Sequence, residues 1–218
     1  RFWAYSANTR PSELSAGDTA DYTALMAASQ ALIADQVLTA YPVHSHRRLL
    51  DVGGGDGAFA LAAMQQSARL EACVFDLPAV SDSARQRFER AGFGNRGRAC
   101  GGDFLADPLP PGYDLVSLVR ILHDHDDNAV RQILQGVRRA IAPDGVVLIA
   151  EPMLGTRGAQ PVAAAYFGFY LMAMGQGKPR TPAAIESLLR GAGFTTIKSH
   201  RTHAPLLACV VSARPQDG

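Results

Sequence analysis

Apolar residues recur along the chain in two alternating patterns: short uninterrupted runs, and stretches with three- and four-residue helical spacing. The runs predict strands at Leu49–Val52, Ala72–Phe75, Arg98–Cys100, Leu115–Val119 and Val146–Ala150. The stretches between them predict helices that begin near Ala58, Pro78 and Asn128. Strands that alternate with crossover helices are typical of a parallel sheet, so the pattern predicts a doubly wound α/β fold.

Further elements are predicted on both sides of this alternating region. A helix is expected from Tyr22 to Tyr41, where apolar side chains share one face and Pro42 follows. Another helix begins at Thr181-Pro182 and ends at Gly191–Gly193, and closing strands are expected at Phe194–Lys198 and Leu206–Val211. The chain has 218 residues, which predicts a single hydrophobic core.

The composition narrows the class of protein. Hydrophobic residues make up 47% and charged residues 19%, as in an ordinary globular protein. Lys and Arg (21) nearly balance Asp and Glu (20), so we do not expect a nucleic-acid partner. The sequence contains neither a signal peptide nor a transmembrane segment, and its cysteines (Cys73, Cys100 and Cys209) form no CxxC pair, so we expect a soluble cytoplasmic protein. The chain begins at Arg1 in the middle of a pattern, which suggests that it continues upstream.

A glycine turn follows the first predicted strand, in Leu49-Leu50-Asp51-Val52-Gly53-Gly54-Gly55-Asp56-Gly57-Ala58. Glycines at Gly53 and Gly55 let the backbone bend sharply and let a ligand approach the main chain. The turn can be interpreted as GxGxxA, which suits a dinucleotide, or as DxGxGxG, which suits an adenosyl ligand.

Acids at the ends of the next two strands favour the adenosyl ligand. Asp76 lies about 20 residues beyond the turn, where a carboxylate can accept hydrogen bonds from both ribose hydroxyls. Asp103 could accept the amino group of adenine, and Phe104 could cover the base. A turn cap at Asp103 and a core position for Phe104 are the structural alternatives.

Several segments, in order along the chain, resemble the small-molecule O-methyltransferases that include plant phenolic enzymes and their bacterial relatives. They are Leu50–Gly55, Phe75–Pro78, Gly102–Phe104, Leu122–Asp124, Ala150–Pro152 and Gly177–Thr181. Arg120–Asp127 and Tyr166–Met174 carry a narrower likeness to carotenoid 1-hydroxyl methyltransferases of the hydroxyneurosporene type.

The resemblance implies a Rossmann-like class I methyltransferase fold, with a seven-stranded, mostly parallel sheet whose last strand is reversed. It implies that residues 1–45 lead from an amino-terminal dimerisation domain into a catalytic domain at residues 46–218. The full-length protein would be a homodimer that uses S-adenosyl-L-methionine and methylates a small apolar hydroxylated substrate, without a metal.

The resemblance also assigns roles to residues. His123 would be the general base, and Glu151 would hold its imidazole. Arg120 would join Gly53, Gly55, Asp76, Asp103 and Phe104 in binding the cofactor, and the substrate would contact Met26, Tyr170 and Met174. The family usually supplies a second acid beside the histidine, but this chain has Pro179 at that position.

Other hypotheses remain open from the sequence. His123 and His125 with Asp124, Asp126 and Asp127 could form a metal cluster, although Asp126 and Asp127 suit the start of the next helix and we prefer helix capping. A nicotinamide-dependent oxidoreductase and a non-catalytic adenosyl-binding module are the competing functional classes. The acceptor could also be a phenol, a polyketide or a ring carbon.

Overall fold

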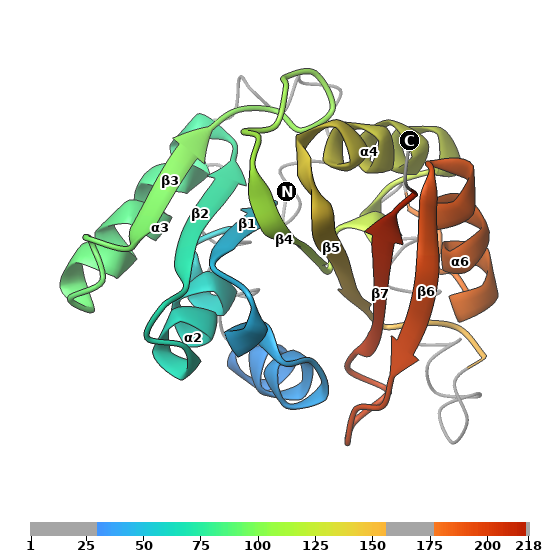
Figure 1. Ribbon diagram of the computed structural model, residues 1–218, viewed down its shortest axis with the longest axis horizontal. Helices are drawn as coiled ribbons and strands as arrows, with labels where there is room; N and C mark the ends of the chain where they lie inside the picture. The colour runs from blue at the N-terminus through green and yellow to red at the C-terminus, as the bar shows by residue number, and fades with distance from the viewer. Residues whose placement is uncertain (1–29, 156–176, 217–218) are drawn as a thin grey trace, which may run out of the picture.

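The computed structural model describes residues 30–155 and 177–216 and contains one seven-stranded sheet (Figure 1). The strands lie in the order β3-β2-β1-β4-β5-β7-β6. Their bounds are β1 Arg48–Val52, β2 Glu71–Asp76, β3 Gly97–Gly101, β4 Tyr113–Val119, β5 Ile141–Glu151, β6 Phe194–His200 and β7 Cys209–Pro215. Strand β7 is antiparallel to both of its neighbours, β5 and β6, whereas the pairs from β3 to β5 are parallel.

Helices cover both faces of the sheet. Besides a helix at residues 30–40, they are α2 Ala58–Gln66, α3 Pro78–Arg90, α4 Asp127–Ala140 and α6 Pro182–Gly191, with short 3-10 helices η3 Val43–Ser45 and η4 Leu122–Asp124. The helix at 30–40, α2 and α3 pack on one face, and α4 and α6 pack on the other. Neighbouring residues of an inner strand therefore enter different clusters: in β1, Leu49 packs with the first group and Leu50 with the second.

The sequence pattern located most of these elements. The predicted fold class is confirmed, including the reversed last strand. All seven predicted strands form, and the four predicted helix starts lie within one residue of those observed. The helix expected at Tyr22–Tyr41 is described only from residue 30 to residue 40.

The bounds predicted for the last strand are wrong. Leu206 and Leu207 were expected to begin it, but they lie in a turn with exposed fractions of 42% and 40%, and β7 begins at Cys209. The apolar pair has the composition of a strand but no partner strand to pair with. At its other end β7 continues to Pro215 because β6 pairs with it along that length.

Candidate active site

The predicted site residues of the described chain meet at one edge of the sheet. Gly53 follows β1, Asp76 ends β2, Phe104 lies just beyond β3, His123 lies just beyond β4, and Glu151 ends β5. Because β1 to β5 are parallel, their carboxyl ends share this edge, which is where open α/β sheets bind ligands. The sheet order therefore assembles one candidate site from residues far apart in the sequence.

The glycine turn after β1 needs its glycines for conformation and for space. Gly53 and Gly55 have φ values of 67° and 59°, in the left-handed region that other residues rarely adopt. A Cβ at Gly53 would overlap the side chain of Ile121, and a Cβ at Gly54 would lie 2.5 Å from Oδ2 of Asp51. The turn thus presents bare backbone to the site edge.

Asp76 is bound to this turn through its carboxylate. Oδ2 accepts a hydrogen bond from the Gly55 N–H at 2.8 Å, and Oδ1 accepts one from the Leu77 N–H at 2.7 Å. Burial raises the pKa of Asp76, and these two hydrogen bonds offset part of that rise. Asp76, the residue predicted to bind the ribose, therefore lies against the glycine turn. Main-chain N–H groups fix the orientation of its carboxylate.

Asp103 and Phe104 lie beside the turn in different ways. Oδ1 of Asp103 accepts the N–H of Leu105 at 2.9 Å, so this carboxylate caps a turn, which was the structural alternative to an adenine contact. The Phe104 ring packs edge-on against His125, with 5.6 Å between ring centroids, and a Cβ at Gly53 would lie 3.5 Å from it. Phe104 thus borders the glycine turn and the histidine loop.

His123 and Glu151 form a buried pair, with exposed fractions of 3% and 1%. Nδ1 of His123 lies 3.8 Å from Oε1 of Glu151, which is longer than a hydrogen bond. The same Oε1 accepts the backbone N–H of His123 at 3.1 Å and that of Leu122. The Glu151 carboxylate therefore lies beside the imidazole without a hydrogen bond to it at this distance, and it holds the backbone of the loop that carries His123.

A second acid at His123 was not predicted. Oδ1 of Asp124 lies 3.3 Å from Nε2 of His123, so carboxylates face both ring nitrogens. Burial alone would lower the pKa of His123, but the charges of Asp124 and Glu151 outweigh it, and the pKa is raised. Burial raises the pKa of Asp124 itself. Asp124 thus supplies an acid next to the histidine, where Pro179 supplies none. The sequence contains Asp124 directly after His123 but does not indicate which way its side chain points.

Arg120 adopts a strained backbone conformation at the end of β4. Its φ of 60° is one of two positive values among the described residues other than glycine. Its N–H still donates to the carbonyl of Ala150 at 2.8 Å, so the turn toward His123 begins directly from the sheet ladder. Strain of this kind is concentrated at functional sites. The positive charge of Arg120 acts on His123 and Asp124, lowering the pKa of both.

The edge contains an acceptor that fits a ligand with a polar N–H group. Asp51 is 1% exposed, and its Oδ1 accepts the Ser117 hydroxyl at 2.6 Å. Its Oδ2, beside Gly54, has no hydrogen-bond partner among the described residues, and burial raises the pKa of Asp51 to about 7. An amino donor at the bare turn would relieve this buried acceptor, so the residues fit the cofactor expected from the sequence.

Other expectations have different outcomes. Met26, Tyr170 and Met174 lie outside the described residues. Asp126 caps α4, accepting the N–H groups of Asn128 and Ala129, whereas Asp127 is the first helical residue. Within residues 30–155 and 177–216, no three His, Cys, Asp or Glu side chains are grouped to hold a metal ion.

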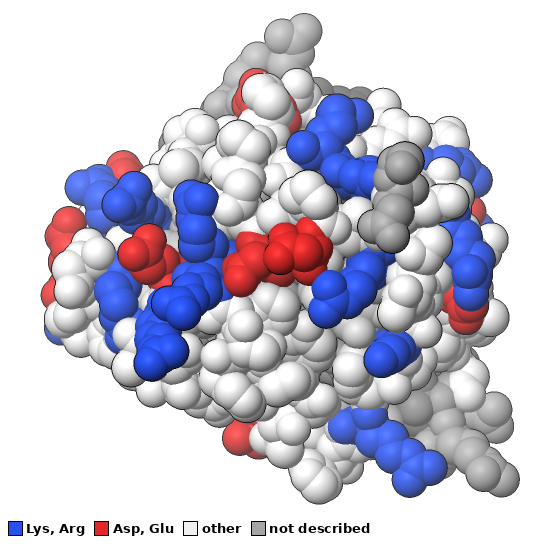
Figure 2. All heavy atoms as spheres, viewed as in Figure 1, with Lys and Arg blue, Asp and Glu red and all other residues white. Residues whose placement is uncertain are grey.

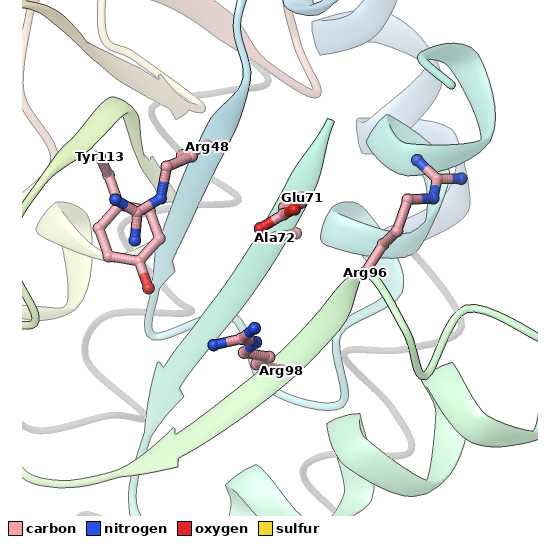
Figure 3. Close-up of a pocket in the computed structure, with 6 residues that line it drawn as sticks. All are labelled: Arg48, Glu71, Ala72, Arg96, Arg98 and Tyr113. Atoms are coloured by element: carbon pink, nitrogen blue, oxygen red, sulfur yellow. The ribbon is translucent and has the colours of Figure 1, made fainter. Parts of the chain in front are cut away.

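A small pocket lies at the opposite edge of the sheet, by the amino ends of the strands (Figure 3). There the guanidinium of Arg48 lies over the ring of Tyr113, 4.8 Å from its centroid. The guanidinium of Arg96 donates hydrogen bonds to the carbonyls of Ser67, Leu70 and Met64. None of the predicted site residues borders this pocket.

Charged side chains are unevenly distributed over one face of the molecule. On the face in Figure 2, basic side chains gather on the left with acidic ones beside them, other basic side chains lie apart on the right, and broad uncharged areas separate these groups. None of the helices in the described parts of the chain is both long and apolar enough to cross a membrane.

Solved structures share this architecture. Human N-acetylserotonin methyltransferase, solved in complex with S-adenosylmethionine, superposes with a TM-score of 0.82 at 28% identity, over 93% of this chain and 57% of that one. An O-methyltransferase of neocarzinostatin biosynthesis, solved with S-adenosylhomocysteine and 1,4-dihydroxy-2-naphthoic acid, gives 0.80 at 26% identity, over 93% and 59%. The fold is therefore that of the class I methyltransferases.

The sequence relatives identify the family. The O-methyltransferase domain family matches residues 5–195, and the chain belongs to this family. It is 42% identical over 223 aligned residues to demethylspheroidene O-methyltransferase of Cereibacter sphaeroides, covering 100% of this chain and 57% of that protein. The chain thus spans little more than half of the length of this relative.

Proposed function

We propose that the protein is an S-adenosylmethionine-dependent O-methyltransferase in which His123 takes the proton of the acceptor hydroxyl. The observation that carries this proposal is the position of His123, a buried imidazole between two carboxylates, at the same sheet edge as the glycine turn and Asp76. A base and an adenosyl cradle at one edge are what methyl transfer to a hydroxyl requires.

The residues of the glycine turn would hold the cofactor. Gly53 and Gly55 offer backbone, Asp76 offers a carboxylate to ribose hydroxyls, and Asp51 offers its unpartnered oxygen to an amino donor. When bound, S-adenosylmethionine supplies a methyl group that its sulfonium has already activated. The protein must therefore mainly align the acceptor oxygen and remove its proton.

The basicity of His123 limits how the proton can leave. An unperturbed imidazole has a pKa of ~6.5, against ~15.7 for an unactivated hydroxyl such as that of water. Deprotonation in advance would cost about 12 kcal/mol, from roughly nine pKa units at about 1.36 kcal/mol each. The raised pKa of His123 reduces this gap only in part. Proton transfer to His123 therefore accompanies methyl transfer for an aliphatic alcohol.

The acceptor we propose is the 1-hydroxyl of a carotenoid, in carotenoid biosynthesis. Similarity to demethylspheroidene O-methyltransferase along the whole chain supports it. A phenolic or polyketide hydroxyl is the second candidate, supported by the naphthoic acid in the structure of the neocarzinostatin enzyme.

We also propose a homodimer, which sedimentation of the full-length protein would test.

Two measurements test the proposed function. Calorimetry with S-adenosylmethionine and with NAD should show binding of the first alone, and the reverse result would favour an oxidoreductase. Incubation of the protein with labelled S-adenosylmethionine and either hydroxylated carotenoids or hydroxynaphthoates should give a labelled ether product. Cofactor binding without any transfer would favour a non-catalytic adenosyl-binding module.

A further inference from the structure

The loop that carries His123 is held through its backbone from two sides. On one side Glu151 accepts the N–H groups of Leu122 and His123. On the other side, three carbonyl oxygens of the loop accept hydrogen bonds from Lys178 and Arg180. The Lys178 N–H donates to His123 at 2.9 Å, and Arg180 donates to Leu122 at 2.7 Å and to His125 at 2.8 Å. The imidazole is therefore placed by a backbone that has little freedom.

The Arg180 side chain donates two of the hydrogen bonds that hold the loop carbonyls. Its guanidinium is buried, with 3% of the residue exposed, and Nη1 also donates to the Lys178 carbonyl at 3.1 Å. Nε and Nη2 donate to Oδ1 of Asp127 at 3.0 and 2.8 Å, which neutralises the buried charge. Only the planar fork of an arginine can reach carbonyls before and after His123 at once, since a lysine offers a single ammonium group.

We propose that Arg180 is a positioning residue for His123, fixing the carbonyls on both sides of it so that the imidazole stays between Asp124 and Glu151. This inference rests on the proposed function, in which His123 is the base. Arg180 belongs to the segment Gly177–Thr181, where Pro179 replaces the usual acid. Although the acid is absent, the neighbouring Arg180 connects this segment to the histidine loop through its hydrogen bonds to the loop carbonyls.

The charged groups around His123 predict what a loosened loop would change. Asp124 and Glu151 raise its pKa, Arg120 lowers it, and His125 lies on the same loop. Release of the loop would relieve the burial that lowers the pKa of His123 and would also weaken the effect of the two carboxylates that raise it; because the net shift is upward, the pKa should fall back toward its ordinary value. A protein without the Arg180 fork should therefore titrate His123 at a lower pH.

The test compares Arg180→Lys with Arg96→Lys, a matched control. Arg96 also donates to three backbone carbonyls, but at the opposite edge of the sheet. Arg180→Lys should lower kcat at least tenfold, leave the Kd for S-adenosylmethionine within about twofold, and lower the titration midpoint of His123 seen by NMR. Arg96→Lys should change unfolding temperature but neither kcat nor the midpoint. Equal effects of the two variants, or an unchanged midpoint in Arg180→Lys, would overturn the proposal.

A substitute variant and a readout that does not depend on turnover complete the test. If Arg180→Lys does not fold, the half-exposed Asp127→Asn is measured instead, and it should lower kcat about threefold and shift the midpoint downward; an unshifted midpoint would again refute the inference. The NMR titration needs no turnover. If the parent protein transfers no methyl group, the proposed function fails, while a midpoint lowered in Arg180→Lys alone still supports the positioning role.

Discussion

At the scale of single residues, the two carboxylates that face His123 determine how activity should depend on pH. A raised imidazole pKa means that the proton is retained to a higher pH than the ordinary value of about 6.5. The neutral base is then lost as pH falls through that raised pKa. We expect kcat to rise with pH through a midpoint above 6.5.

Asp124→Asn tests the origin of this midpoint. Removing one of the two charges that raise the pKa of His123 should shift the acidic limb of kcat to lower pH. The matched control is Asp126→Asn, which changes an exposed acid that caps α4 and should leave the midpoint in place. A profile that does not move in Asp124→Asn, or moves upward, would show that Asp124 does not act on the imidazole.

Asp76→Ala should weaken cofactor binding. The ribose hydroxyls would lose a charge-assisted acceptor worth ~1.5–3 kcal/mol, which corresponds to roughly 10- to 150-fold in Kd. Calorimetry with S-adenosylmethionine measures this directly. Asp82→Ala, an exposed acid paired only with Arg85 among the described side chains, is the control. A folded Asp76→Ala protein with the parent Kd would place the ribose elsewhere.

Sequence reasoning predicted which candidate site residues share an edge of the sheet better than it predicted their contacts. Strand ends placed Asp76, His123 and Glu151 together because parallel strands share an edge. Spacing could not show that Glu151 would bind loop N–H groups, or that Asp124 would turn toward Nε2, because the backbone of η4 sets those directions. Asp103 likewise satisfies a nearby N–H, which a one-dimensional motif does not distinguish from a ligand contact.

At the scale of elements, helix α4 begins where the histidine loop ends, so its cap also limits that loop. Asp126 accepts two N–H groups of the first turn, at 2.9 and 2.8 Å. Asp126→Ala should lower the free energy of unfolding by about 1 kcal/mol, whereas Asp126→Asn, which keeps an acceptor, should change it much less. Chemical denaturation measures both. An Asp126→Ala protein as stable as the parent would mean that the cap contributes nothing.

Element boundaries were less predictable than the elements themselves. Helix starts follow from local signals such as Pro78, Asp126 and Thr181, each next to the first turn that it favours. The end of a strand depends on where its neighbour stops, as β7 shows by starting after Leu207 and extending to Pro215. Such a boundary requires knowledge of the partner strand.

At the scale of the whole molecule, the alternating pattern predicted a two-sided parallel sheet, but the reversal of β7 came only from the family likeness. The apolar pattern of a strand does not depend on its direction, so the buried runs of β5 and β7 look alike although the two strands are antiparallel. The strand order places β1, which contains Asp51, inside the sheet between β2 and β4. At this inner position only 1% of Asp51 is exposed.

The buried Asp51 predicts a pH dependence of stability. Its pKa is raised from 3.8 to about 7, so between these values the folded state binds more protons and stability falls as pH rises. Relative to the parent, Asn at this position should therefore gain up to about 4 kcal/mol between pH 4 and pH 7, from about three pKa units. Urea unfolding of Asp51→Asn and the parent at both pH values gives the difference. A constant difference would show that Asp51 titrates normally.

The most direct measurement is steady-state and binding analysis of His123→Ala with S-adenosylmethionine and the acceptor that the parent protein methylates. If His123 takes the proton as the methyl group moves, kcat should fall by roughly 10²–10⁴, while the Kd for S-adenosylmethionine stays nearly unchanged, because the cradle at Gly53, Gly55 and Asp76 is separate from the base. A kcat equal to that of the parent in the folded variant would contradict a catalytic role for His123 at this site.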